Sequence, residues 1–262
     1  MQQLIKHIQV NIPFTMLHDK YISVFLRHAI NPEIGIDAQA LERFSFSEFS
    51  SVAERLREHP LTITLHGPFI DLSPGSTDPA VGALTKHRFE QVLKLVPLFK
   101  PKAVVFHAGY EEKRYGYMKE KWIENSVQLW SWLGARMGDE GALMMLENVY
   151  ENGPEDIQVV FESLGQQNIG FCLDTGHLSA FGQAPLDKWL VSLGSYLGQI
   201  HLHDNHGNKD EHLALGRGNI DFQLLFRYLK TRKHKPPIVT LEPHQEEDFL
   251  PSLKYMEKNW PW

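Results

Sequence analysis

Residues Ile169–His177, IGFCLDTGH, join a short apolar segment to polar groups that can bind a metal. Ile169–Leu173 is apolar on both faces, which is typical of a parallel β-strand that is covered on both sides. Asp174 follows at the point where the strand should end, and His177 comes shortly after it. We therefore interpret this stretch as a buried strand that presents a carboxylate and an imidazole at its carboxyl end.

Short apolar runs of this kind alternate with longer amphipathic stretches along the whole chain. The other expected strands are Ile8–Ile12, Glu33–Ile36, Leu61–Leu65, Ala103–Phe106, Ala142–Leu146, Gln199–Leu202 and Ile238–Leu241. Helices are expected from the capping box Ser45–Glu48, after Asp78–Pro79, at Lys121–Met137, from Gly153, and at Leu186–Leu193, Asp221–Arg232 and Glu246–Lys258. No linker divides the sequence, so we expect one domain over residues 1–262. Strands alternating with helices form either an open doubly wound sheet or a closed barrel.

The polar residues at the strand ends favour the barrel. Six successive strands are each followed by a side chain that can bind a metal: His66, His107, Glu147, Asp174, His201 and Glu242. In a closed barrel the carboxyl ends of the strands form one ring, where active sites of this fold lie, whereas in an open sheet they would be spread along an edge. The predicted fold is therefore a single (β/α)8 TIM barrel.

These residue types also indicate a metal site. A lone His or Glu after an apolar strand is more often a surface or capping residue, but six at equivalent positions are hard to explain in that way. Ionised carboxylates beside apolar strands are costly to bury without a partner, and a shared cation supplies one. Imidazole and carboxylate ligands without thiolate suit Zn, Mn, Co or Fe. His201 and His203 share one face of their strand, so either could be a ligand.

Composition limits the other functions that this chain could have. The 262 residues carry a net charge of −6, which argues against a broad nucleic-acid-binding face without excluding a small local one. Cys172 is the only cysteine, so no internal disulfide forms, and we expect it in the core. No apolar run is long enough for a signal peptide or a membrane span, so we expect a soluble cytoplasmic protein without a membrane partner. Trp260 and Trp262 could belong to an interface between subunits, so a homo-oligomer is left open.

The motifs resemble those of the xylose isomerase-like TIM-barrel superfamily. This group contains sugar and sugar-phosphate isomerases and epimerases together with the endonuclease IV family. The resemblance runs from about Leu61 to Glu242 and rests on HGP, LEN, LDTGH, HLHDN, the segment Asp210–Ile220 and the final LE. Each motif is loose by itself, but their order along the chain is specific.

The two branches of the superfamily imply different ligand sets. Endonuclease IV enzymes hold three zinc ions, and the resemblance places their nine ligands at His66, His107, Glu147, Asp174, His177, His201, Asp210, His212 and Glu242. Isomerases and epimerases use a smaller set that corresponds to Glu147, Asp174, His201 and Glu242, usually with one metal. The chain departs from endonuclease IV in reading DTGH for DTCH and HGPF for HAPY, so that Phe69 replaces a tyrosine near DNA.

Two mechanisms follow from these sets, with one to three divalent ions as cofactor. As an isomerase or epimerase, the protein would hold a small carbohydrate on the metal and move a proton through an enediolate with Glu147 and Glu242. His177, Arg217 and Phe14 would contact the substrate. As a phosphodiesterase, two or three ions would activate water. A structural metal site without enzymatic activity is the third reading. We adopt the sugar-type enzyme, because the acidic charge and the missing DNA-facing features outweigh the number of matching ligands.

Overall fold

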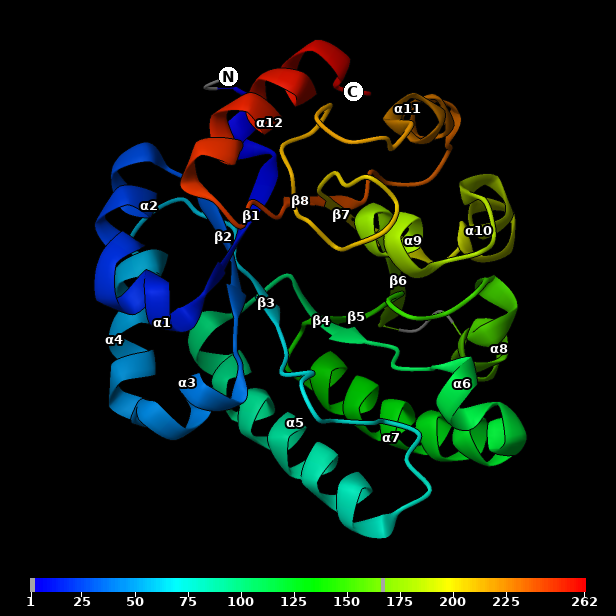
Figure 1. Ribbon diagram of the computed structural model, residues 1–262. Helices are drawn as coiled ribbons and strands as arrows, with labels where there is room; N and C mark the ends of the chain where they lie inside the picture. Colours follow the sequence, from blue (N-terminus) through cyan, green and yellow to red (C-terminus); the bar gives the residue numbers. More distant parts are fainter. Residues whose placement is uncertain (1–2, 166–167) are drawn as a thin grey trace.

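The computed structural model describes residues 3–165 and 168–262 and contains a closed barrel of parallel strands (Figure 1). The strands are β1 Ile8–Pro13, β2 Asn31–Gly35, β3 Thr64–His66, β4 Ala103–His107, β5 Leu143–Glu147, β6 Ile169–Asp174, β7 Leu197–Leu202 and β8 Ile238–Leu241. Each strand pairs in parallel with the one before it, and β1 pairs with β8 to close the ring. The prediction of a (β/α)8 TIM barrel is confirmed.

Helices surround the barrel on its outer side (Figure 1). They are α1 Phe14–Met16, α2 Ile22–His28, α3 Ala38–Arg43, α4 Phe46–Arg57, α5 Pro79–Phe99, α6 Glu112–Tyr115, α7 Lys119–Asp139, α8 Gln158–Leu164, α9 Thr175–Phe181, α10 Leu186–Leu193, α11 Phe222–Thr231 and α12 Glu246–Asn259. Short 3-10 or π turns lie at Leu4–Lys6, Leu17–Tyr21, Gly116–Met118 and Pro154–Asp156. The predicted capping box is present at Ser45 and Glu48, and Asp78 caps α5. Among the described residues, no helix combines the length and the apolar character needed to cross a membrane.

Apolar side chains cover both faces of the strands, which explains why the strands are apolar on both sides. The larger cluster lies between strands and helices and includes the fully buried Trp122, Trp130 and Trp189. A smaller cluster of Ala103, Val105, Met145 and Cys172 is contributed by the opposite faces of β4, β5 and β6. Cys172 is buried there, as predicted.

The strand register places the polar residues of neighbouring strands close together at their carboxyl ends. Glu147 is paired with His107 on one side and with Cys172 on the other, and Asp174 is paired with His201. β4, β5 and β6 each run one residue beyond the predicted end, so that these ligand candidates are the last residues of their strands. Their backbones are therefore fixed by the hydrogen bonds of the barrel.

Candidate metal centre

Four buried side chains, on β5, β6 and β7 and directly after β8, converge at the mouth of the barrel. We call them the central cluster: Glu147, Asp174, His201 and Glu242. His201 Nδ1 lies 3.1 Å from Glu147 Oε1, 3.0 Å from Glu242 Oε1 and 3.9 Å from Asp174 Oδ2. A single proton on Nδ1 cannot form good hydrogen bonds to three carboxylates at the same time. Atoms that each ligate one ion at about 2 Å lie roughly 3–4 Å apart, so these separations suit a shared cation.

Glu33 on β2 holds the imidazole of His201 from the other side. His201 Nε2 lies 2.9 Å from Glu33 Oε1. The fully buried Glu33 also accepts hydrogen bonds from Thr64 Oγ1 at 2.9 Å, from Thr240 Oγ1 at 3.2 Å and from Gln199. An acceptor on Nε2 leaves the Nδ1 lone pair for a metal. This role of Glu33 was not predicted from the sequence, although a charge inside an apolar strand was the available signal.

A second group, the strand-side cluster, shares Glu147 with the central cluster and consists of His66, His107 and Glu147. Glu147 Oε2 lies 3.0 Å from His66 Nε2 and 3.6 Å from His107 Nε2. His66 Nδ1 lies 2.9 Å from the carbonyl oxygen of Gly67, which leaves Nε2 directed at Glu147. Burial lowers the pKa of His107 to about 3, so its ring is neutral, as a metal ligand requires. The ring of the exposed Phe69 stacks on that of His107, with the two ring centroids 4.1 Å apart.

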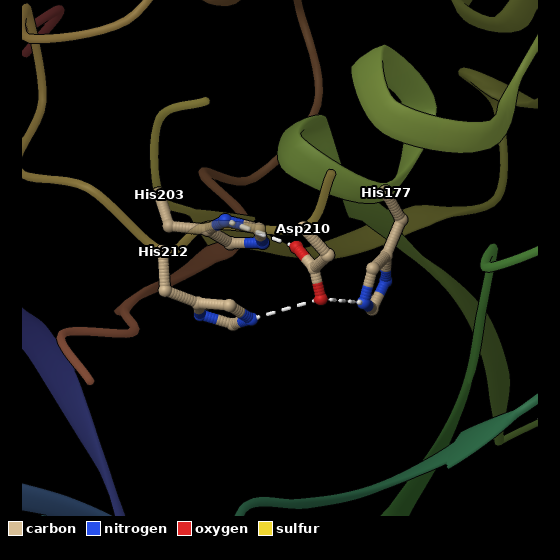
Figure 2. A group of neighbouring side chains, drawn as sticks. All are labelled: His177, His203, Asp210 and His212. Carbon is tan, nitrogen blue, oxygen red and sulfur yellow. Dashed lines mark hydrogen bonds and ion pairs between the residues drawn. The ribbon is translucent and has the colours of Figure 1, made fainter. Parts of the chain in front are cut away.

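A third group forms where the segment between β7 and α11 meets α9. We call it the loop cluster: His177, His203, Asp210 and His212. Figure 2 shows the Asp210 carboxylate between the rings of His203 and His212 on one side and the ring of His177 on the other. The nearest distances to its oxygens are 3.0 Å for His212 Nε2, 3.4 Å for His177 Nε2 and 3.5 Å for His203 Nδ1. His203 also lies close to Asp174 and Glu242, so it adjoins the central cluster as well as the loop cluster, whereas His201 belongs to the central cluster.

The electrostatics of the site fit a bound cation. Burial would raise the pKa of Glu147, but the charge of His201 and hydrogen bonds from neighbouring imidazoles outweigh it and hold the pKa well below its usual range. Burial likewise acts to raise the pKa of Asp210, whereas His177 and His212 lower it. Glu147 and Asp210 are therefore ionised, and the imidazoles that surround them stand where divalent ions would fit. The donor set of carboxylates and imidazoles suits Zn, Mn, Co or Fe.

Two predicted substrate contacts lie elsewhere. Phe14 is fully buried, with its ring 4.3 Å from that of Phe49 and 5.0 Å from that of Phe44, so it has no surface for a substrate and the prediction is corrected. Phe14 begins α1, and its apolar ring packs in the hydrophobic cluster between the barrel and the helices. Arg217 is mostly exposed and pairs with Asp248 on α12 at 3.1 Å, so it is not part of the three clusters.

The comparison with protein families agrees with this geometry. The family described as xylose isomerase-like TIM barrel matches residues 32–259. The chain belongs to this family. The match spans all three clusters and β2–β8, and it extends the resemblance seen in the motifs to most of the chain.

Two curated relatives represent this family. The uncharacterized protein MJ1311 of Methanocaldococcus jannaschii is 28% identical over 207 residues, which cover 76% of this chain and 70% of the relative. A protein of Mycobacterium leprae named probable endonuclease 4 is 23% identical over 212 residues, which cover 76% of this chain and 81% of the relative. The family thus includes proteins named as enzymes.

Two solved structures share the fold over almost the whole chain. The TTHB071 protein from Thermus thermophilus, obtained by soaking with ZnCl2, has a TM-score of 0.80 and 24% identity, and the match covers 97% of this chain and 98% of that one. A D-tagatose 3-epimerase-like protein has a TM-score of 0.79 and 23% identity, and covers 97% and 96%. At these identities the likeness establishes the fold alone.

Proposed function

We propose that this protein is a divalent-metal-dependent isomerase or epimerase that acts on a sugar or sugar phosphate by proton transfer beside a carbonyl group. The observation that carries the proposal is the pair of glutamates, Glu147 on β5 and Glu242 directly after β8. Their carboxylate oxygens approach the same atom, His201 Nδ1, at 3.1 and 3.0 Å from strands three positions apart round the barrel. A substrate at the mouth would lie between two carboxylates.

The roles of the residues follow from this arrangement. A divalent cation in the central cluster would supply Lewis-acid polarisation of a carbonyl and an adjacent hydroxyl group. Glu147 and Glu242 both have pKa values below the usual range, because nearby imidazoles outweigh the effect of burial, so both are present as carboxylates. In an isomerisation, the carboxylate that removes a proton from carbon becomes a carboxylic acid and can return that proton to the adjacent carbon. In an epimerisation, the second glutamate would first take up a proton from water and then deliver it to the opposite face of the same carbon. Glu33 keeps His201 in the orientation that a ligand needs.

The net charge of the chain and its similarity to other proteins support a small-molecule substrate. The net charge of −6 is unfavourable for a protein that must neutralise DNA phosphates. The structural neighbour described as D-tagatose 3-epimerase-like shares the barrel over 97% of this chain. We extend its substrate class, a small sugar, to this chain as part of the proposal.

Cleavage of a phosphodiester is the second candidate. The observation that favours it is the presence of the strand-side and loop clusters beside the central one, with Glu147 shared between two clusters. Several closely spaced ions could activate water and neutralise a leaving oxygen. The mycobacterial relatives named probable endonuclease 4 point the same way.

One assay separates the two candidates. Purified protein loaded with Zn²⁺, Mn²⁺ or Co²⁺ is incubated in D2O with a panel of ketoses and ketose phosphates, and separately with duplex DNA that contains an abasic site. We expect deuterium to enter a sugar at the carbon beside its carbonyl. Glu242→Gln should lose this exchange, while Glu211→Gln, a change at an exposed loop residue, should keep it. Cleavage of the DNA without exchange in any sugar would overturn the proposal in favour of the second candidate.

A further inference from the structure

His203 gives the loop cluster a fourth ligand candidate that is not among the nine ligands implied by the endonuclease IV resemblance. We propose that the loop cluster is a metal site closed by four protein ligands, which holds the β7–α11 loop across the barrel mouth and takes no direct part in the reaction. The proposal shares with the proposed function only the premise that the chain binds a divalent metal.

The imidazole of His203 is oriented as a ligand. Its Nε2 lies 3.1 Å from each oxygen of Asp174, so the ring proton belongs on Nε2. The opposite nitrogen, Nδ1, then presents a lone pair to Asp210 Oδ1 at 3.5 Å. Both of these buried atoms lack a hydrogen-bond partner among the described residues. A lone pair facing a carboxylate is unfavourable unless a cation lies between them, and a carboxylate behind the imidazole is the usual support of a histidine ligand.

His212 and His177 are oriented in the same way by backbone carbonyl groups. His212 Nδ1 lies 3.0 Å from the carbonyl oxygen of Glu242, and His177 Nδ1 lies 3.1 Å from that of Asn148. In each ring the other nitrogen, Nε2, faces Asp210 Oδ2, at 3.0 Å and 3.4 Å respectively. Ligand atoms placed about 2 Å from a tetrahedral ion are roughly 3.3 Å apart, which is close to these separations from Asp210, and the four candidate ligand atoms all lie within 4.8 Å of one another.

A glycine makes room for the fourth ligand. The motif reads DTGH in this chain where endonuclease IV has DTCH, so Gly176 stands at the cysteine position. A Cβ atom at residue 176 would overlap the ring of His203. The ring of His203 therefore fits in its place only because residue 176 is a glycine and not the cysteine of endonuclease IV.

A complete protein shell makes an ion here structural. Structural zinc sites have four protein ligands, whereas catalytic sites have three and keep one position for water or substrate. The ring of His203 stacks face to face on that of His212 with centroids 3.7 Å apart, and His212 stacks on His244 with centroids 3.5 Å apart. Because an imidazole binds a metal in the plane of its ring, His203 or His212 would tilt when both bind the ion. Such an ion would have no position for a phosphate, which separates this chain from a trinuclear phosphodiesterase.

The ion would hold the long connection between β7 and α11 in place. This connection contains no helix and lies beside α9 (Figure 1). Asp204 fixes the start of this loop, because its Oδ2 accepts hydrogen bonds from the backbone N–H groups of Gly216 and Gly218 at 2.9 Å. Asp210 and His212 lie between these points. His212 has a left-handed backbone with φ of 52°, a conformation that a bulky residue keeps only where its surroundings enforce it.

The first test compares His203→Asn with His206→Asn, a change at an exposed histidine of the same loop that pairs with Glu211. Metal content is measured by elemental analysis, and the Co²⁺-substituted proteins are compared by visible absorption. His203→Asn should lose about one ion per chain and the intense absorption of four-coordinate Co²⁺, while His206→Asn should keep both. Gly176→Ala retains every ligand but crowds His203, so it should lose the same ion. An unchanged ion count and spectrum in His203→Asn would overturn the proposal.

A second test uses the unaltered protein, so it does not depend on how the variants fold. Hydrogen exchange of residues 205–213 is followed with Zn²⁺ and after chelation, with α4 on the outer side of the barrel as an internal reference. Chelation should speed exchange in the loop at least tenfold more than in α4, and equal change in both segments would contradict a loop-holding ion. A protein that passes both tests but exchanges no sugar proton would refute the proposed function and leave this inference intact.

Discussion

The central cluster and the loop cluster use the same residue types but are held in different ways. Each residue of the central cluster lies within one residue of the end of a barrel strand, so hydrogen-bonded neighbouring strands set its position. In the loop cluster, Asp210 and His212 come from a connection without strand or helix, held mainly by Asp204. The barrel therefore supplies a rigid site for chemistry, whereas the loop depends on contacts that an ion would complete.

The largest effect is expected at the residue that the central and strand-side clusters share. Glu147→Gln keeps the shape of the side chain but removes the charge that ligates and transfers protons. We expect kcat to fall by about 10²–10⁴-fold, the usual contribution of a general acid or base. Glu211→Gln serves as the control. A loss of less than about tenfold would mean that the central cluster is not the reacting part of the site.

Metal removal should affect the two clusters unequally. A ligand that binds only the folded state at about 1,000 times its Kd stabilises it by about 4 kcal/mol, so chelation should lower the free energy of unfolding by several kcal/mol. The measurement is urea unfolding with and without chelator, followed by readdition of Zn²⁺. Limited proteolysis should then cut within residues 203–221 before it cuts the barrel. Equal stability in both conditions would argue against any tightly bound ion.

Asp204→Asn isolates the support of the loop cluster from its ligands. The substitution removes the charged acceptor of the Gly216 and Gly218 N–H groups, and leaving such groups unsatisfied costs about 1–3 kcal/mol each. We expect a loss of stability of about 2–3 kcal/mol in urea unfolding and weaker metal binding in the loop cluster. Retention of the central ion, measured by elemental analysis, would sharpen the distinction. Loss of both ions together would show that the clusters are not independent.

Arg217→Ala should have the smallest effect on stability. The ion pair with Asp248 is solvent-exposed on the arginine side, and such pairs contribute about 0–1 kcal/mol. Contact of Arg217 with an anionic substrate stays a prediction. If Arg217 binds a phosphate, KM should rise for a sugar phosphate and stay constant for the unphosphorylated sugar. A parallel change in both KM values would remove this role.

The strand-borne part of the site was predictable from the sequence, and the loop-borne part only partly so. Apolar runs that end in a polar residue identified Glu147, Asp174 and Glu242, because strand ends in a barrel must meet. The loop cluster was different: only the folded loop shows that His203 directs Nδ1 at Asp210 while its Nε2 faces Asp174. Phe14 was misjudged because its position after β1 resembles a mouth position, whereas its ring turns into the helix layer.

Buried polar residues below the ligands were also beyond the sequence patterns. Glu33 was interpreted as the first residue of a strand, but β2 begins at Asn31 and places this carboxylate inside the barrel. Its partners Thr64, Gln199 and Thr240 come from three other strands, so their contact depends on barrel closure. No local period can reveal such a set.

The most direct test of the metal centre is the metal content of the purified wild-type protein after growth with ample metal. Elemental analysis should give about two or more divalent ions per chain, with one in the central cluster and one in the loop cluster. Fewer than about half an ion per chain would contradict the metal centre itself, whatever reaction the protein performs.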